Sequence, residues 1–198
     1  MSKYHDDLTV ASDPGRFELS DTKLKKLCPE LYGLMPRIVG LIYARDWNDL
    51  IRLRDVIREH IALGDTRAAV VIRKRPLLVA AYTDELDCVA VLRFENKLAS
   101  TFGLEEKTRL LTVNTYGHIS DSLASDLTPG SNSTNRYGNF QPIIADFLVD
   151  DTQQVHRRKR DIGEPEWQRA WNLAQEWIAK HGSKARDGNP VHCANPAF

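Results

Sequence analysis

Polar side chains that could hold a ligand gather in and beside one long segment, residues 117–142, which is dense in Ser, Asn, Gly and Pro. A connection this long inside a compact domain is uncommon and indicates a functional loop, a disordered insert or a wrong assignment of elements. Loops and strand ends commonly display binding groups, although Asn, Ser and Gly also populate ordinary turns. The candidate binding residues are Asn114, Tyr116, His118, Arg136 and Tyr137, with Asp126, Asn132 and Asn135 beside them.

Two runs of basic residues could bind the phosphate groups of a ligand, because guanidinium groups pair with phosphate oxygens through two hydrogen bonds. Acidic residues flank the second run, at Asp150, Asp151 and Asp161, so salt bridges within the chain or a solvated surface are the competing interpretation. Nucleic acid is therefore an allowed partner and not the favoured one. The runs are Arg73, Lys74 and Arg75, and Arg157, Arg158, Lys159 and Arg160, with Arg157 and Arg158 as the candidate binding residues of the second run.

An acidic residue, Asp84 or Asp87, precedes an acid-x-lysine sequence formed by Glu95 and Lys97. This order is similar to that of metal-dependent nucleases of the restriction-endonuclease type, in which two carboxylates hold a divalent metal that activates water. The acids here would lie at opposite ends of one strand, roughly 25 Å apart at ~3.3 Å per residue. We therefore expect these residues to be solvated turn charges, and we expect no metal site.

His-x-Ser occurs twice, at His118 and at His181, and is similar to the paired motifs of two-histidine phosphoesterases. In those enzymes both histidines lie in strands and divide general acid and base work, whereas His181 is expected to end a helix and to interact with its dipole. The sequence has no Gly-rich phosphate loop followed by Lys, no GxSxG, no HExxH and no dinucleotide fingerprint. No cofactor is therefore expected.

The composition is that of a globular protein without an overall charge. Lys plus Arg equals Asp plus Glu at 27 each in 198 residues, so no global field draws the chain to nucleic acid or anionic lipid. The 42% hydrophobic content excludes collagen-like and strongly disordered classes. Three widely spaced cysteines are typical of reduced thiols in a cytosol, and no secretory signal or membrane span is recognisable. We therefore expect a cytoplasmic protein with no membrane contact.

The N-terminal third is expected to be helical. Leu24, Leu27 and Leu31 recur at helical spacing after a cap at Ser20 or Asp21. Residues 37–46 predict a buried short helix, although an apolar run of that length could also be a buried strand. A clearer amphipathic pattern predicts a helix that is capped by Asp46 and ends at Gly64 in a left-handed conformation.

The remainder is expected to be a sheet followed by one helix. Residues 67–94 predict three antiparallel strands, and residues 108–115 and 143–149 predict a fourth and a fifth. The last helix is expected to begin near Pro165, to end at Gly182 and to pack an apolar stripe that includes three tryptophans on the sheet. Any tryptophan left exposed would mark an interface.

These elements predict a single α+β domain over residues 20–182, with a helical N-terminal third, an antiparallel sheet of four or five strands and a covering Trp-rich C-terminal helix. Residues 1–19 are expected to form a flexible arm, and residues 183–198 a polar tail. The expected function is a non-enzymatic interaction protein of the immunity or accessory type that binds a protein partner. One alternative is an enzyme acting on a phosphate-containing substrate, a nuclease or nucleotide hydrolase, with its site in the 114–137 loop; another is a small-ligand sensor.

Overall fold

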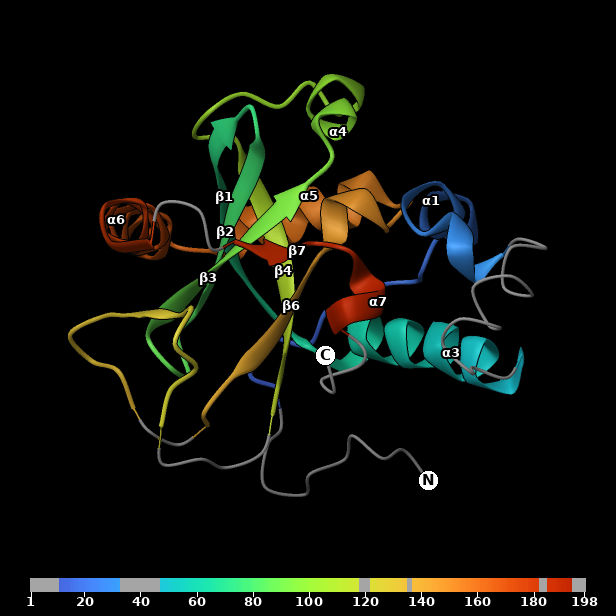
Figure 1. The fold of residues 1–198 in the computed structure, drawn as a ribbon, viewed down its shortest axis with the longest axis horizontal. Helices are drawn as coiled ribbons and strands as arrows, with labels where there is room; N and C mark the ends of the chain where they lie inside the picture. Colours follow the sequence, from blue (N-terminus) through green and yellow to red (C-terminus); the bar gives the residue numbers. More distant parts are fainter. Residues whose placement is uncertain (1–10, 33–46, 118–121, 135–136, 182–184, 194–198) are drawn as a thin grey trace.

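The computed structural model describes residues 11–32, 47–117, 122–134, 137–181 and 185–193. They form one mixed α/β unit with helices around a curled, mainly antiparallel sheet (Figure 1). The helices are α1 (Asp21–Leu27), α3 (Trp47–Leu63), α4 (Asn96–Thr101), α5 (Thr152–Asp161), α6 (Glu164–His181) and α7 (Pro190–Cys193), with 3-10 turns η1 (Pro29–Leu31) and η2 (Ala145–Phe147). The strands are β1 (Asp65–Lys74), β2 (Leu77–Thr83), β3 (Cys88–Phe94), β4 (Arg109–Tyr116), β5 (Thr128–Pro129), β6 (Phe140–Ile144) and β7 (Arg186–Asp187).

The sheet has seven strands, where four or five were expected. Six follow the order β5-β3-β2-β1-β4-β6 with antiparallel neighbours, and β7 pairs in parallel with β3. Strands β5 and β7 have two residues each, which is too short to show the alternation that marks a strand in a sequence. Strand β5 and the start of β6 lie within the expected loop 117–142, and β7 lies within the expected tail.

The predicted meander β1–β2–β3 is confirmed, and its strands are buried on both faces. Val70 and Val91 contact α6 on one face. Val71 and Val79, on the other face, belong to the cluster inside the curl of the sheet, together with Phe147 of η2. Burial on both sides explains why these strands are continuous apolar runs instead of alternating patterns.

Helix α6 lies across β1, β2 and β3, on the left in Figure 1. Trp167 and Trp177 are almost completely buried there, and their indole nitrogens donate hydrogen bonds to the carbonyl oxygens of Ile162 and Asp126, both at 3.3 Å. Trp171 is only half-buried. Among the three tryptophans of α6, it therefore exposes the most surface to a ligand.

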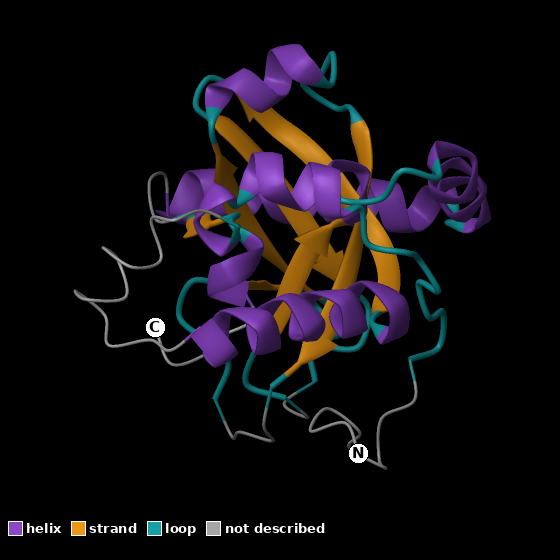
Figure 2. Ribbon diagram, turned by 90° about the vertical axis from the view of Figure 1, so that its right-hand side faces the viewer, coloured by secondary structure: helices purple, strands orange, loops and turns teal. Residues whose placement is uncertain are grey.

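Helix α3 and residues 17–31 cover β4 and β6, on the right in Figure 1, and Figure 2 looks onto this side with helices crossing in front of the strands. The predicted helix before Gly64 is confirmed. Gly64 itself does not have the left-handed backbone that we expected. A Cβ there would lie 2.7 Å from Cγ1 of Val113 and 2.8 Å from the carbonyl oxygen of Asn114. Glycine is required because β4 passes so close.

Residues 11–19, expected to belong to a flexible arm, pack on the domain. Phe17 is 3% exposed and Leu19 is 7% exposed. Leu19 also forms an antiparallel bridge with Val149. Backbone hydrogen bonds from Gly15 to Gly64 and from Arg16 to Ala62 also hold the segment, so it is anchored by both apolar and polar contacts. Residues 1–10, and residues 33–46 with their expected helix, lie outside the described residues.

The chain after β4 differs from expectation in two places. The strand predicted over residues 143–149 starts earlier and ends at Ile144, and the 3-10 turn η2 follows. Apart from Asp146, the segment is apolar and buried, so its sequence does not distinguish a strand from a turn. Helix α5 was not predicted, because Val155 is its only buried residue and an apolar stripe is missing.

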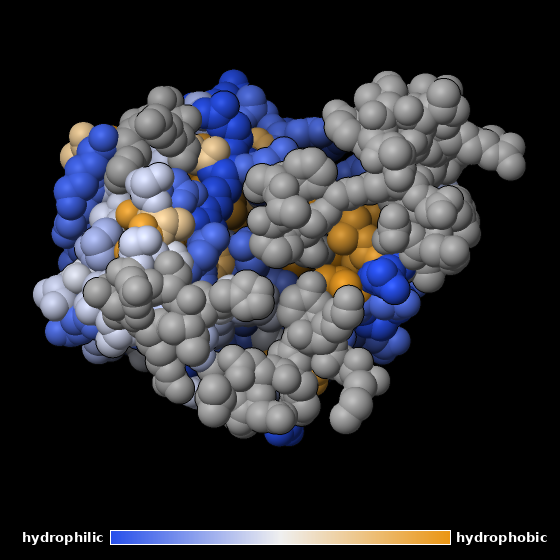
Figure 3. Space-filling model, turned by 60° about the horizontal axis from the view of Figure 1, so that its bottom comes forward, coloured by the Kyte–Doolittle hydropathy of each residue, from blue (hydrophilic) through white to orange (hydrophobic). Residues whose placement is uncertain are grey.

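The surface is mainly polar. Among the described residues, Leu63 is the one large hydrophobic side chain that is exposed, at 53%. On the face shown in Figure 3, apolar colour is confined to a few areas, the largest of them bordered by residues drawn in grey. Within the described part of the chain, no helix is long and apolar enough to cross a membrane.

Candidate functional site

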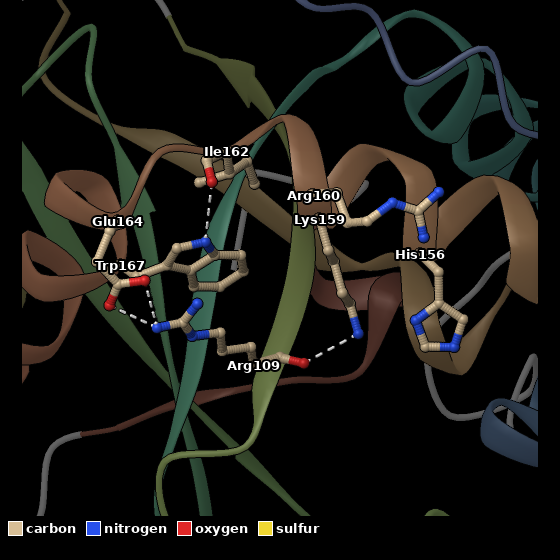
Figure 4. A pocket seen from close by; sticks show the side chains of 7 residues that line it. All are labelled: Arg109, His156, Lys159, Arg160, Ile162, Glu164 and Trp167. Atoms are coloured by element: carbon tan, nitrogen blue, oxygen red, sulfur yellow. Dashed lines mark hydrogen bonds and ion pairs between the residues drawn. The ribbon is translucent and has the colours of Figure 1, made fainter.

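A groove lies between α5 and α6, over the start of β4. It consists of two adjoining hollows of about 530 Å³ and about 170 Å³, which share Arg109, Glu164 and Trp167. Figure 4 shows the larger hollow, with α5 on one side and α6 on the other. We call this site the α5–α6 groove. The side chains of its larger hollow are Arg109, His156, Lys159, Arg160, Ile162, Glu164 and Trp167, and the smaller hollow adds Val70, Lys107, Gln168 and Trp171.

Helix α5 forms the basic wall of the groove. Its first turn is capped by Asp151, whose carboxylate accepts a hydrogen bond of 2.9 Å from the backbone nitrogen of Gln154. Its last turn carries Arg158, Lys159 and Arg160, where cations are stabilised by the partial negative charge of a helix C-terminus. This local preference explains why a run of basic residues forms a helix here.

Polar contacts of two α5 side chains hold the helix against the rest of the domain. Nζ of Lys159 donates a hydrogen bond of 2.9 Å to the carbonyl oxygen of Arg109 and pairs with Asp146. Arg158 donates to the carbonyl oxygen of Pro14 at 2.6 Å. Both side chains therefore have a structural role besides their charge.

Arg109 lies at the centre of the groove. Its Nη2 atom contacts both carboxylate oxygens of Glu164, at 2.6 and 2.8 Å, and its guanidinium lies 5.0 Å from the centre of the Trp167 ring. Figure 4 shows the guanidinium beneath the indole. Lys107 is placed similarly over Trp171, at 5.2 Å. Cations and aromatic rings thus alternate along the groove.

Three side chains of α5 in or beside the groove have no polar partner among the described residues. The side chains of His156, Arg157 and Arg160 are exposed, and none makes a hydrogen bond or ion pair with any described residue. Arg157 lies on α5 beside the groove, while His156 and Arg160 line it. Glu164 is the one carboxylate in the lining, and it is shared with Arg109. The groove therefore has an excess of positive charge in a chain whose net charge is zero.

A second charged cluster surrounds Arg67 of β1 and has the opposite character. The Arg67 side chain is 7% exposed and contacts Asp65 at 2.9 Å, Asp13 at 3.0 Å and Asp84. Burial raises the pKa of the Asp65 carboxyl, and the neighbouring guanidinium opposes that shift. Burial also raises the pKa of Glu166, which accepts a hydrogen bond from the backbone of β1. Acidic charge is in excess here, and the guanidinium of Arg67 is paired with three carboxylates.

Asp87 anchors the segment 126–134 to α6. It is buried and accepts hydrogen bonds from Nε and Nη2 of Arg169, from the backbone nitrogen of Asn132 at 2.8 Å and from the hydroxyl of Tyr82 at 3.1 Å. The hydrogen bond from Arg169 is the main cause of the lowered pKa of Asp87. A Cβ at Gly130 would lie 2.4 Å from an Asp87 oxygen, so glycine allows the segment to close on this pair.

Of the residues expected to bind a ligand at the 114–137 loop, Asn114 and Tyr137 are buried, Tyr116 and Asp126 are partly buried, and Asn132 is exposed. Asn114 is 1% exposed and donates to the carbonyl oxygen of Tyr82 at 2.8 Å. Tyr137 is 3% exposed and stacks near the half-buried Tyr116, whose hydroxyl bonds that of Thr83. Asn114, Tyr116 and Tyr137 therefore support the end of the sheet. His118, Arg136 and Asn135 lie outside the described residues.

The carboxylates of the nuclease-like sequence do not come together. Asp84 pairs with Arg67 and Asp87 with Arg169, at one end of β3, while Glu95 pairs with Lys97 beyond its other end. In the described part of the chain, no group of three or more His, Cys, Asp or Glu side chains is arranged to hold a metal ion. For the His-x-Ser pairs, the side chains of His118 and His181 are not among those described.

The basic run of α5 was recognised from the sequence, but the side chains opposite it were not. Lys107 and Arg109 precede and begin a strand, and Glu164 starts a helix 55 residues after Arg109. The sequence signal that could have located them is the pair Trp167 and Trp171, four residues apart and so on one helix face. Comparison with protein-family models, with curated proteins and with solved structures found no match.

Proposed function

We propose that this protein binds a phosphate-bearing ligand in the α5–α6 groove. The observation that carries the proposal is the excess of cationic side chains, Lys107, Arg109, Lys159 and Arg160 against the one carboxylate Glu164, in the described lining of a groove that also contains aromatic rings. Like the function expected from the sequence, the proposed function is binding. The phosphate group of the ligand comes from the alternative hypothesis of an enzyme that acts on a phosphate-containing substrate. The proposal moves the site from the 114–137 loop to the groove.

Charge supports an anionic ligand. Lys107, Arg109 and Arg160 supply positive charge along the groove, and Lys159 adds a fourth cation that Asp146 already neutralises. An excess of cations beside low-dielectric aromatic walls raises the local concentration of anions and speeds their association. A solvated helix face would have the same cations without the hollow and the rings.

The geometry of Arg109 supports an anion with several oxygens. Its guanidinium already holds two carboxylate oxygens of Glu164, and phosphate offers oxygens at a similar spacing. Glu164 therefore occupies a place that a phosphate group could take. His156 and Arg160, across the hollow, could contact the remaining oxygens (Figure 4).

The expectation of a protein partner of the immunity or accessory type remains a prediction, as does a cytoplasmic location. An acidic polypeptide could also use the cations of the groove, so it is included as a competitor in the experiments. A small-ligand sensor is compatible with the same groove if its ligand carries phosphate.

The test is a titration of the full chain with inorganic tripolyphosphate, in which binding is measured by calorimetry and by tryptophan fluorescence. We expect saturable binding that weakens as salt rises from low values to about 0.15 M, because the contacts are exposed ion pairs. Arg160→Glu is expected to weaken binding about tenfold or more and to lower the salt dependence, with the thermal unfolding midpoint unchanged.

The matched control is Arg52→Glu on α3, which reverses the charge of an exposed arginine that has no partner among the described residues. Arg75→Glu tests the other basic run. The proposal is overturned if tripolyphosphate does not bind at low salt, or if binding is lost with Arg75→Glu and retained with Arg160→Glu.

A further inference from the structure

We propose that the phosphate-bearing ligand of the α5–α6 groove is a single-stranded nucleic acid, with one base stacked on Trp171. This inference rests on the proposed function and narrows it to one class of ligand. It starts from the two tryptophans of the groove, which lie four residues apart on the same face of α6.

The two rings differ in what they can contact. Trp167 is 3% exposed, and the guanidinium of Arg109 lies over it. Trp171 is half-buried, and the group over it is the flexible, exposed Lys107, which has no ion pair with any described residue. A base can reach the Trp171 ring when Lys107 turns toward a phosphate.

The order of groups along the groove matches the order of groups along a nucleic acid strand. Arg160 and Lys159 form a cationic end at α5, Arg109 lies in the middle, and Trp171 with Lys107 forms an aromatic and cationic end beside α6. Phosphates at the cationic positions and a base on Trp171 would belong to one continuous strand. Cations along the backbone and aromatic rings under the bases are the common means of binding single strands.

Stacking on Trp171 requires an unpaired base. In a duplex both faces of each internal base are covered by its neighbours, so a duplex could use the cations of the groove and leave the ring unused. A free mononucleotide could use the ring and only part of the cationic surface. The groove as a whole therefore fits a single strand best.

The experiment measures binding of a single-stranded oligouridine and of the matching oligodeoxythymidine, an RNA duplex, uridine monophosphate and polyglutamate. We expect either single strand to bind at least about tenfold more tightly than the duplex or the mononucleotide, with quenching of tryptophan fluorescence. Trp171→Ala is expected to weaken single-strand binding about tenfold, because one stacked base contributes about 1–3 kcal/mol. Trp171→Phe, which retains an aromatic face, is expected to restore most of the affinity.

Two further variants separate stacking from folding. Ile178→Ala removes another partly buried side chain from α6, two turns away from Trp171, and is expected to leave binding unchanged. Lys107→Ala changes an exposed side chain only, and is expected to weaken binding without altering the unfolding midpoint.

The outcomes distinguish the inference from the proposed function. If tripolyphosphate binds and oligonucleotides do not, the groove is a phosphate site and the single-strand inference is wrong. Equal binding of duplex and single strand, unchanged affinity of Trp171→Ala, or tighter binding of polyglutamate would each overturn it as well. If neither tripolyphosphate nor an oligonucleotide binds, both proposals fail.

Discussion

Arg67 on β1 and Arg160 on α5 carry the same side chain in two clusters of opposite character. Arg67 is buried, contacts three carboxylates and lies where acidic charge is in excess. Arg160 is exposed and has no ion pair or hydrogen bond with any described residue. The first cluster joins the start of β1 to residues before and after it in the chain, whereas the second leaves its charge available to a ligand.

The difference explains why the net charge of this chain is a poor guide to its partners. Lys plus Arg and Asp plus Glu are equal in number, but acids are in local excess around Arg67 and bases are in local excess in the α5–α6 groove. Composition correctly excludes a global field and says nothing about a local one.

The largest effect is expected for Arg67→Ala. It would leave Asp65 buried without its guanidinium, and breaking a buried pair in this way typically costs about 3–5 kcal/mol of the free energy of unfolding. Chemical denaturation measures the change. Arg73→Ala on the same strand, which removes an arginine without a partner among the described residues, is the control and should cost less than about 0.5 kcal/mol. A loss below about 1 kcal/mol for Arg67→Ala would mean that its pairs are not structural.

The second prediction concerns the pH dependence of folding stability that is due to His60, which is buried, unlike the exposed His156 of the groove. Nε2 of His60 lies 2.8 Å from the carbonyl oxygen of Val113, so this nitrogen is the donor. Burial lowers the pKa of His60 to about 4, against opposing hydrogen bonds to the carbonyl groups of Val113 and Gln141. The unfolded chain therefore takes up this proton at a higher pH than the folded chain.

Folding stability should consequently fall as the pH drops from about 6.5 to about 4, by about 3 kcal/mol from this group. Asp65 and Glu166, whose pKa values burial raises, act in the opposite direction at the lower end of this range. Denaturation curves of the wild type and of His60→Gln, measured across the range, isolate the histidine. The same slope in both proteins would show that His60 is not the cause.

An intermediate effect is expected for Asp87→Ala. It removes the acceptor of the Arg169 and Asn132 hydrogen bonds and should cost about 1–3 kcal/mol, because Asp87 is buried and Arg169 can turn to solvent. Hydrogen exchange should rise at residues 126–134. If exchange in that segment is unchanged, Asp87 does not anchor it.

The smallest effect on stability, and the most informative effect on binding, is expected for Glu164→Gln. Glu164 is 68% exposed, so the variant should change the free energy of unfolding by less than about 0.5 kcal/mol. Tripolyphosphate should bind about threefold more tightly, because Arg109 loses a competing carboxylate. Glu18→Gln is the control at another exposed position. Weaker binding would mean that Glu164 positions Arg109 for the ligand.

Much of the fold could be predicted from sequence patterns. The α3 segment has the helical period of one buried face, whereas β1–β3 are continuous Val- and Ala-rich runs, as expected for strands buried on both faces. The short strands β5 and β7 could not be predicted, since two residues have no period. Helix α5 has one buried residue and is held by hydrogen bonds to distant carbonyl groups, which no local pattern reveals.

The groove could be predicted in part. The basic run of α5 was visible, but its opposing side chains come from β4 and α6, and only the fold brings them together. The polar residues near the 114–137 loop show the opposite case. Asn114 and Tyr137 are residue types that often bind ligands, but both are buried in the structure. Residue type indicates what a side chain can bind, and burial decides whether it is accessible.

Helix α5 has two sets of side chains, one that packs on the domain and one that is exposed to solvent. Val155, Arg158 and Lys159 attach it to the domain, whereas His156, Arg157 and Arg160 contact no described residue through hydrogen bonds or ion pairs. Substitutions in the second set can therefore alter ligand preference at little cost to folding. This short helix is an evolvable part of the molecule, in which selectivity can drift or be redesigned while the sheet behind it stays the same.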